Sequence, residues 1–394
     1  MLLAAGPLLV ASLTREPFPI AMAVFMQRLP WLLFGIVAGA IIDRLDRRML
    51  MVAADGLRAV VLVLLVVAAA AGTLNLAVIY VAMFLLGTAE TFADNASSVL
   101  LAVTVPKTGL GEANARMYGS RIVANQLAGP PLGALLFGIS LLLPFGVGAV
   151  CFIVAAALVA SLRRVPPEVA EPECASLRTE VVEGWRWLWR HAPMRTLTIM
   201  VTVFNITFGA AFSVWVLYAY ERLGLNEFGF GLLLTAMAVG GLVGTAVYRR
   251  LEARFSYAAL LRAGLVIETL THVALAATAN TAFAVTVMVA FGVHATVWGT
   301  TGSTIRQRAV PDRLQGRVTS VYLLGGVGAL AVGAALGGVI AQRWGVVAPF
   351  WFAAVGAAIT TAWIWRSLDN VAAAAEGGDD PPPGEMPSGR SVAG

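Results

Sequence analysis

The chain alternates long apolar runs with short polar loops over most of its length. An apolar helix of about 20 residues spans the roughly 30 Å hydrocarbon core of a bilayer, because each residue adds about 1.5 Å. Twelve runs can be read, and their approximate bounds are Leu2–Leu13, Pro19–Ile42, Leu50–Ala71, Leu76–Val103, Ala115–Phe137, Ile139–Leu162, Thr196–Tyr220, Phe230–Tyr248, Tyr257–Ala277, Ala282–Thr304, Val318–Ala341 and Val347–Trp365. The pattern predicts an all-α polytopic membrane protein with twelve transmembrane helices.

The last six runs repeat features of the first six at an offset of about 205 residues, as expected of a transporter built by duplication. Three short motifs recur, namely Gly39–Arg44 as Gly244–Arg249, Val105–Pro106 as Val310–Pro311 and Gly129–Ala134 as Gly333–Gly338. The second copy has Tyr248 where the first has Asp43. We therefore expect two pseudo-symmetric six-helix halves.

The first run is shorter than its counterpart in the second half. As a helix, Leu2–Leu13 would span only about 18 Å, which is too short to cross a bilayer. The seventh run begins near Thr196, so the repeat offset would start the first helix roughly ten residues before Met1. We therefore expect the first helix to be truncated, or translation to start upstream.

The chain divides by composition into four parts. Proline, charged residues and an amphipathic pattern separate the two groups of apolar runs, and the last residues are rich in Ala, Gly, Asp and Pro. The expected parts are a first half at 1–162, a cytoplasmic linker with an amphipathic helix at 163–195, a second half at 196–368 and a disordered cytoplasmic tail at 369–394.

Basic residues are concentrated in alternate loops. Loops after the even-numbered runs, counted with Arg116 and Arg262 near the start of the runs that follow them, hold 19 Lys and Arg residues, whereas the intervening loops hold 3. Cytoplasmic loops carry the excess of Lys and Arg in membrane proteins, so both termini are expected in the cytoplasm and the chain in the plasma membrane. The net charge of +5 comes from these short loops and not from a continuous patch, which argues against a nucleic-acid partner.

Motifs for several other function classes are missing from the sequence. The chain has no Gly-rich loop ending in Gly-Lys-Ser or Gly-Lys-Thr, no His-Glu-x-x-His, no Gly-x-Ser-x-Gly and no paired Cys motif. An enzyme and a pump driven by ATP within this chain are therefore excluded, and no cofactor or metal is expected. If the chain moves a solute, an ion gradient should supply the energy.

Ionisable residues within the apolar runs are functional candidates, because they are costly in a bilayer. Glu90 and Asp94 lie one helical turn apart in the fourth run and are followed by Asn95. Two carboxylates this close repel, so at least one could hold a proton near neutral pH. Alternatively, they are structural groups that bond to the backbone or to Arg28, which lies in the second run and itself needs a partner.

Other polar residues in the runs divide into structural and cavity candidates. Near the cytoplasmic end, Asp55, Arg58 and Arg121 could brace a gate, although we favour mutual pairing for the first two. Glu268 and His272, four residues apart in the ninth run, are expected to form a structural pair. The seventh and tenth runs contain residues for which exposure to a cavity is more plausible, namely Asn205, His294 and Trp298.

The sequence between the second and third runs, Gly39-x-x-x-Asp43-Arg44-x-x-Arg47-Arg48, resembles the corresponding loop of the major facilitator superfamily. In that family the aspartate and arginines belong to a cytoplasmic gate, and helices 1, 4, 7 and 10 line a central cavity. The resemblance thus implies a gate at this motif and a place for Glu90 near the substrate.

Two further resemblances narrow the expectation. Gly129-Pro130-x-x-Gly133 resembles the Gly-Pro signature of antiporter branches, and such residues suit a bending gate. Gln27–Trp31, Phe92–Asn95 and Gln315–Val318 look most like the macrolide-efflux and siderophore-exporter branch, although the fourth run lacks the arginine of many proton-coupled drug antiporters.

The resemblance implies a monomeric, proton-coupled exporter of a hydrophobic drug or natural product. The other possibilities are a siderophore or metabolite exporter, a nutrient importer and a membrane receptor or scaffold that transports nothing.

Overall fold

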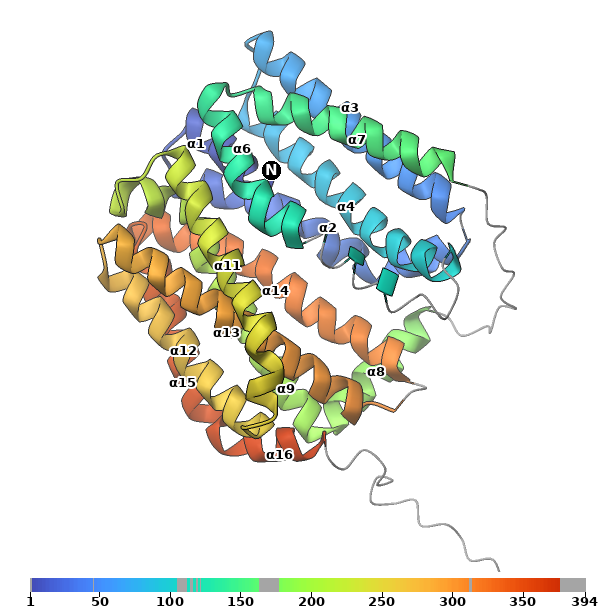
Figure 1. The fold of residues 1–394 in the computed structure, drawn as a ribbon, viewed down its shortest axis with the longest axis vertical. Helices are drawn as coiled ribbons and strands as arrows, with labels where there is room; N and C mark the ends of the chain where they lie inside the picture. The colour runs from blue at the N-terminus through green and yellow to red at the C-terminus, as the bar shows by residue number, and fades with distance from the viewer. Residues whose placement is uncertain are drawn as a thin grey trace, which may run out of the picture.

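The structure is a computed structural model that describes residues 2–44, 46–104, 112–113, 116–117, 120, 122–162, 177–311 and 314–375, and these ranges are helical with no strand. Figure 1 shows the arrangement of the elements, which are α1 (Leu2–Leu13), α2 (Pro17–Arg44), α3 (Arg47–Ala70), α4 (Leu76–Thr104), the π-helix η2 (Ile122–Ala128), α6 (Gly129–Ile139), α7 (Leu143–Ser161), α8 (Leu177–Arg190), α9 (Ala192–Ser213), α10 (Trp215–Leu217), the π-helix η3 (Tyr218–Arg222), α11 (Glu227–Glu252), α12 (Tyr257–Ala277), α13 (Thr281–Ala309), α14 (Gln315–Trp344), α15 (Ala348–Ile364), the 3-10 helix η5 (Trp365–Ser367) and α16 (Leu368–Ala373).

The predicted runs are found as helices, which confirms the all-α polytopic fold. Within the described ranges, 10 helices are long and apolar enough to cross a membrane. The 12-residue α1 and the continuous η2–α6 segment take the places of the first and fifth runs.

The fifth run departs from regular α-helix for a local reason. Pro130 and Pro131 are among the first residues of α6 and have no N–H to donate to the preceding turn. The chain before them forms the π-helix η2. Such bulges often coincide with functional sites.

Helix contacts follow a twofold pattern, which confirms the pseudo-symmetric halves. In the first half α4 packs on α2 and α3, and α3 packs on α7; in the second half α13 packs on α11 and α12, and α12 packs on α15. Across the boundary α2 packs on α14, and α6 packs on α11. Each contact within the first half therefore has a repeat counterpart within the second half, and the two contacts across the boundary are counterparts of each other (Figure 1).

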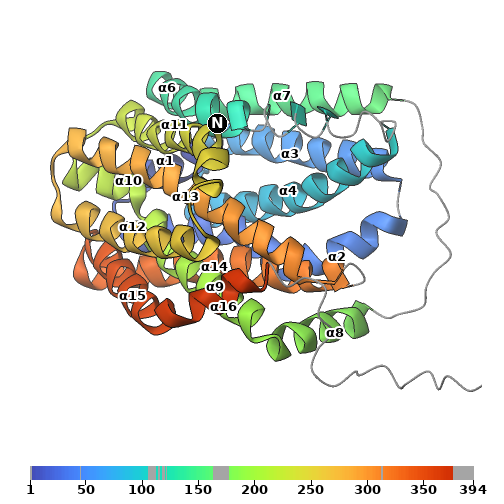
Figure 2. The same cartoon turned by 60° about the horizontal axis from the view of Figure 1, so that its bottom comes forward.

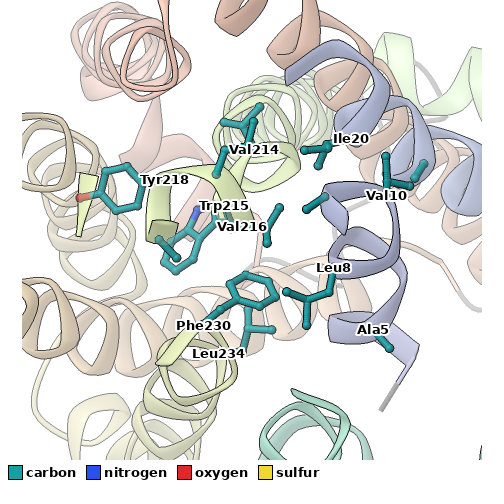
Figure 3. Packing of buried hydrophobic residues seen from close by; sticks show 14 of the residues in the cluster. Ala5, Leu8, Val10, Ile20, Val214, Trp215, Val216, Tyr218, Phe230 and Leu234 are labelled. Carbon is teal, nitrogen blue, oxygen red and sulfur yellow. The ribbon is translucent and has the colours of Figure 1, made fainter. Parts of the chain in front are cut away.

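The halves are joined by apolar side chains at one end of the molecule, which we call the sealed end. There Ala5, Leu8 and Val10 of α1 and Ile20 of α2 share a buried cluster with Val214, Trp215 and Val216 around α10 and with Phe230 and Leu234 of α11 (Figure 3). The other end holds Arg48, Arg249, Arg250, Arg306 and Arg308, and we call it the basic end.

Between the two ends the halves are in contact along α2 and α14. A Cβ on Gly328 of α14 would lie 2.6 Å from Leu32 Cδ1, so these two helices are in close contact. Between the described parts of α4 and α13 there is at most a marginal contact. Among the described residues, the apolar cluster that joins the halves therefore lies at the sealed end.

Two short helices pack beside the spanning helices, α8 on α14 and α9, and α16 on α12 and α9 (Figure 2). The amphipathic α8 is joined to α14 by an ion pair between Glu183 and Arg317. The predicted disordered tail, 369–394, starts too early. Residues 368–373 form α16, in which Leu368, Val371 and Ala372 are buried. Residues 376–394 lie outside the described ranges.

Candidate functional site

A small cavity lies between the two halves, just behind the sealed end. Its lining comes from α1 and α2 in the first half and from α9, α10 and α11 in the second, and it consists of Pro7, Val24, Gln27, Arg28, Phe212, Ser213, Trp215, Val216 and Phe230. Arg28 brings a positive charge to an otherwise largely apolar and aromatic surface. Such a mixture of apolar walls and a few polar groups is typical of the lining of small-molecule sites, while the volume of about 20 Å³ has room for about one water molecule.

Arg28 is positioned by a close crossing of α2 and α4. A Cβ on Gly87 of α4 would lie 2.1 Å from the carbonyl oxygen of Gln27, so only glycine permits this approach. Glu90 follows Gly87 by three residues and is half-buried. The two predicted functional residues are therefore carried by helices that touch next to Arg28 and one turn before Glu90.

The expected ion pair between Arg28 and the carboxylates of α4 is not formed in the described part of the structure: none joins Arg28 to Glu90 or Asp94. Asn95 Nδ2 donates to the Thr91 carbonyl at 2.8 Å, which turns this amide back onto its own helix. Asp94, one turn after Glu90, is half-buried. The coupling roles of Glu90, Asp94 and Asn95 stay predictions.

The three predicted cavity residues of the second half have partners within that half. Asn205 Nδ2 donates to the Val201 carbonyl at 2.8 Å. Trp298 meets the Phe204 ring edge-on, with centroids 5.8 Å apart, and its Nε1 is buried without a hydrogen-bond partner among the described residues. His294 is buried, and its Nε2 lies 2.9 Å from Glu268 Oε2.

His294 thus faces α12 as a hydrogen-bonded core residue, whereas its place in the tenth run had made exposure to a cavity plausible. The physical reason is that the buried Glu268 carboxylate requires hydrogen-bond donors, and α13 supplies one. The predicted pairing of Glu268 with His272 is present at 3.2 Å, but it is only part of the arrangement.

The gate motif is described in part. Gly39 lies within α2, while the side chains of Asp43, Arg44 and Arg47, and Arg121 as a whole, lie outside the described residues. Arg48 Nε donates to the Val159 carbonyl at 3.1 Å, and its Nη2 donates to the Ala160 carbonyl. Arg48 therefore binds the carbonyls at the end of α7, which belongs to the same half.

Asp55 and Arg58 pair with each other, at 3.0 Å between Oδ1 and Nη1. The Arg58 guanidinium also lies over the Phe152 ring, 5.0 Å from its centroid. These contacts join α3 to α7 within the first half, as in the structural alternative that we favoured for this pair.

The Gly129–Gly133 motif lies at the boundary between the halves. Gly129, Pro130 and Gly133 are buried. A Cβ on Gly231 of α11 would lie 3.1 Å from the Pro130 carbonyl oxygen and 2.7 Å from Ala134 Cβ. The motif therefore combines a π-helical segment, two prolines and a close interhelical contact, which are the properties expected of a bending point.

Sequence reasoning missed an aromatic stripe of which Phe212 and Trp215 line the cavity. Phe204, Phe208, Phe212 and Trp215 recur at spacings of three or four residues, which places them along one face of a helix. Phe208 stacks on Phe212 with centroids 5.3 Å apart and on Phe291 at 5.4 Å. The spacing alone could have revealed this stripe, although not that Phe212 and Trp215 face the other half.

Comparison with known proteins identifies the family. The family model described as transmembrane secretion effector matches residues 3–380. No curated protein sequence gave a match.

Solved structures show the same fold at low identity. A mutant of the nucleoside transporter NupG has a TM-score of 0.74 at 10% identity, covering 93% of this chain and 94% of that one. A bacterial homologue of the iron transporter ferroportin in its inward-facing state has a TM-score of 0.71 at 14% identity, with 93% and 96% covered. The homologue's outward-facing structure gives 0.57 at 16% identity, with 94% and 97% covered.

The family match extends over nearly the whole chain, and the arrangement of helices is that of transporters of the major facilitator type. The protein therefore belongs to the transmembrane secretion effector family and is a multi-pass membrane transporter of this fold.

Proposed function

We propose that this transporter exports a hydrophobic drug or natural product in exchange for protons, by alternating access. The observation that carries the proposal is the cavity between the halves, whose walls are aromatic and aliphatic apart from Gln27, Arg28 and Ser213. Such walls suit a hydrophobic organic molecule, and Arg28 suits one with an anionic or strongly accepting group.

The distribution of charge gives the proposed orientation. If the basic end faces the cytoplasm, as the excess of arginine predicts, the sealed end faces outward. The halves would then be closed on the outside, which is an inward-facing state. The greater likeness to the inward-facing ferroportin homologue supports this assignment.

Two elements are proposed to move between the states. The Gly39–Arg48 segment would close the cytoplasmic side, with Asp43 and its neighbouring arginines bridging the halves. The π-helical turn before Gly129 and Pro130 would let α6 bend against α11. Both proposals follow the way in which twofold transporters rock about a central site.

A growth-inhibition panel in a host that lacks its own efflux pumps tests the function. Cells that express the chain should tolerate hydrophobic compounds better and accumulate less of them than cells without it. Collapse of the proton gradient should remove the difference in accumulation. Phe212→Ala should weaken the protection several-fold, whereas Phe352→Ala, at an exposed position of α15 outside the cavity, should not.

Each result bears on a different part of the proposal. Accumulation that is unchanged for every compound would contradict transport of this class, and higher accumulation would indicate an importer. A difference that survives collapse of the gradient would contradict proton coupling. Equal effects of the two phenylalanine variants would contradict the assignment of the cavity.

A further inference from the structure

A buried carboxylate and two histidines form a cluster inside the second half, away from the cavity. Glu268 of α12 accepts from His272 on the next turn, with 3.2 Å between Oε1 and Nε2. Its other oxygen, Oε2, lies 2.9 Å from Nε2 of His294 on α13. All three side chains are less than a tenth exposed.

If Glu268 is ionised, its two hydrogen bonds define the tautomers of both histidines. An ionised carboxylate can only accept, so both histidines must present Nε2–H to it. In the neutral form of each ring Nδ1 then carries no proton. His272 Nδ1 is buried and has no hydrogen-bond partner in the described structure.

With Glu268 ionised and both histidines neutral, the cluster is one positive charge short of neutrality. An ionised glutamate with two neutral histidines has a net charge of −1 in the interior of a membrane protein, where an uncompensated charge is costly. Addition of one proton, to a histidine or to the carboxylate, makes the cluster neutral. The arrangement therefore favours uptake of a single shared proton.

In the described parts of the surrounding helices, no cation replaces that proton. The spanning parts of the surrounding helices contain no ionisable side chain from 196 to 213 in α9, from 228 to 247 in α11 and throughout α15, and α13 has only His294 before Arg306. The nearest cation along α12 is Arg262, six residues before Glu268. Its Nη2 is already paired with Asp369 Oδ2 at 2.7 Å.

Aromatic side chains separate the cluster from the cavity that contains Arg28. His272 lines a small apolar cavity together with Phe208, Trp215 and Phe291. Trp215 also lines the cavity that contains Arg28. A movement of α10 when the sealed end opens would therefore change the access of water to His272.

We propose that Glu268, His272 and His294 form a proton-binding site of the second half, which takes up one proton and releases it when Trp215 moves. The use of this proton for transport rests on the proposed function, but its binding does not. Within the described residues no group of three or more His, Cys, Asp or Glu side chains could hold a metal ion.

The three histidines of the chain make a direct test possible. Purified full-length protein in lipid nanodiscs, labelled with ¹⁵N-histidine, should show two rings that titrate together in one proton step. His191→Asn should remove the third, independent signal and leave the coupled step intact. Glu268→Gln should abolish the coupling, and His294→Gln should do the same if the first variant does not fold.

Two outcomes would overturn the site. In one, both rings stay neutral with Nε2–H from pH 5 to pH 9. In the other, they titrate separately and unchanged in Glu268→Gln.

The titration measures proton binding and the growth-inhibition panel measures export, so a negative panel would not change the titration. The two proposals can therefore fail separately. If the panel identifies an exported compound, export by Glu268→Gln should lose its dependence on the proton gradient. Normal dependence would contradict the use of this proton in transport.

Discussion

Gly87 determines how closely α2 and α4 approach, and so where Arg28 and Glu90 lie. A methyl group there would meet the Gln27 carbonyl at 2.1 Å, and backbone cannot move aside as a flexible side chain can. We expect Gly87→Ala to destabilise the protein by about 1 to 3 kcal/mol, as overpacking does, and to reduce export.

Thermal unfolding in detergent and export in cells check this prediction. Gly56→Ala is the matched control, because a Cβ at Gly56 in α3 meets nothing within 4 Å. Equal melting temperatures for the two variants would show that the α2–α4 contact is less close than described.

His191 is the N-cap of α9 and makes the stability of the protein depend on pH. Its Nδ1 accepts from the Met194 N–H at 3.4 Å, and its ring stacks on Trp187 with centroids 4.8 Å apart. Burial lowers the pKa of His191 below its usual value of 6.5. The unfolded chain therefore binds a proton first as the pH falls, so this contribution is present above about pH 6.5 and is lost below it.

We accordingly expect the melting temperature to fall between pH 7.5 and pH 5.5 by more in the wild type than in His191→Asn. Asparagine can cap the helix but does not titrate. An identical fall in both proteins would assign the pH dependence to other groups.

The loop between α2 and α3 combines a capping residue and the predicted gate. Asp46 Oδ1 accepts from the Arg48 N–H at 3.0 Å and from the Met49 N–H at 3.3 Å, so it caps α3. Asp46→Ala should cost about 0.5 to 2 kcal/mol of stability while export per folded molecule is retained.

Asp43→Asn should have the opposite profile if Asp43 bridges the halves. Export should fall several-fold, while insertion in the membrane and melting temperature stay near wild type. Export normalised to the amount of membrane protein compares the two variants. Full export by Asp43→Asn would contradict the gate.

The whole transporter should need a titratable group at position 90 if Glu90 carries a coupling proton. Glu90→Gln imitates the protonated carboxyl group, so it should retain exchange of an exported compound across proteoliposomes without a gradient. It should lose uphill export driven by pH. Uphill export with normal pH dependence would exclude Glu90 and favour Asp94, or the second-half cluster.

The order of helices and their two-half arrangement could be predicted because they depend on local properties. A long apolar run must form a helix in a bilayer, since its backbone groups have no other partners there. The predicted Tyr257–Ala277 coincides with α12. Prolines 130 and 131 also explain η2 locally, although a π-helix was not foreseen.

The sequence by itself thus determined the membrane fold, the repeat and which polar residues lie within the spanning helices. Only the tertiary structure decided which of these residues meet. His294 bonds to Glu268, 26 positions away in the sequence, and Arg48 bonds to the Val159 carbonyl, 111 positions away. Arg28 lines a cavity and does not pair with the carboxylates of α4. The physical reason is that a helix's periodicity fixes the relative directions of its side chains, while its neighbours and its rotation depend on packing along its whole length.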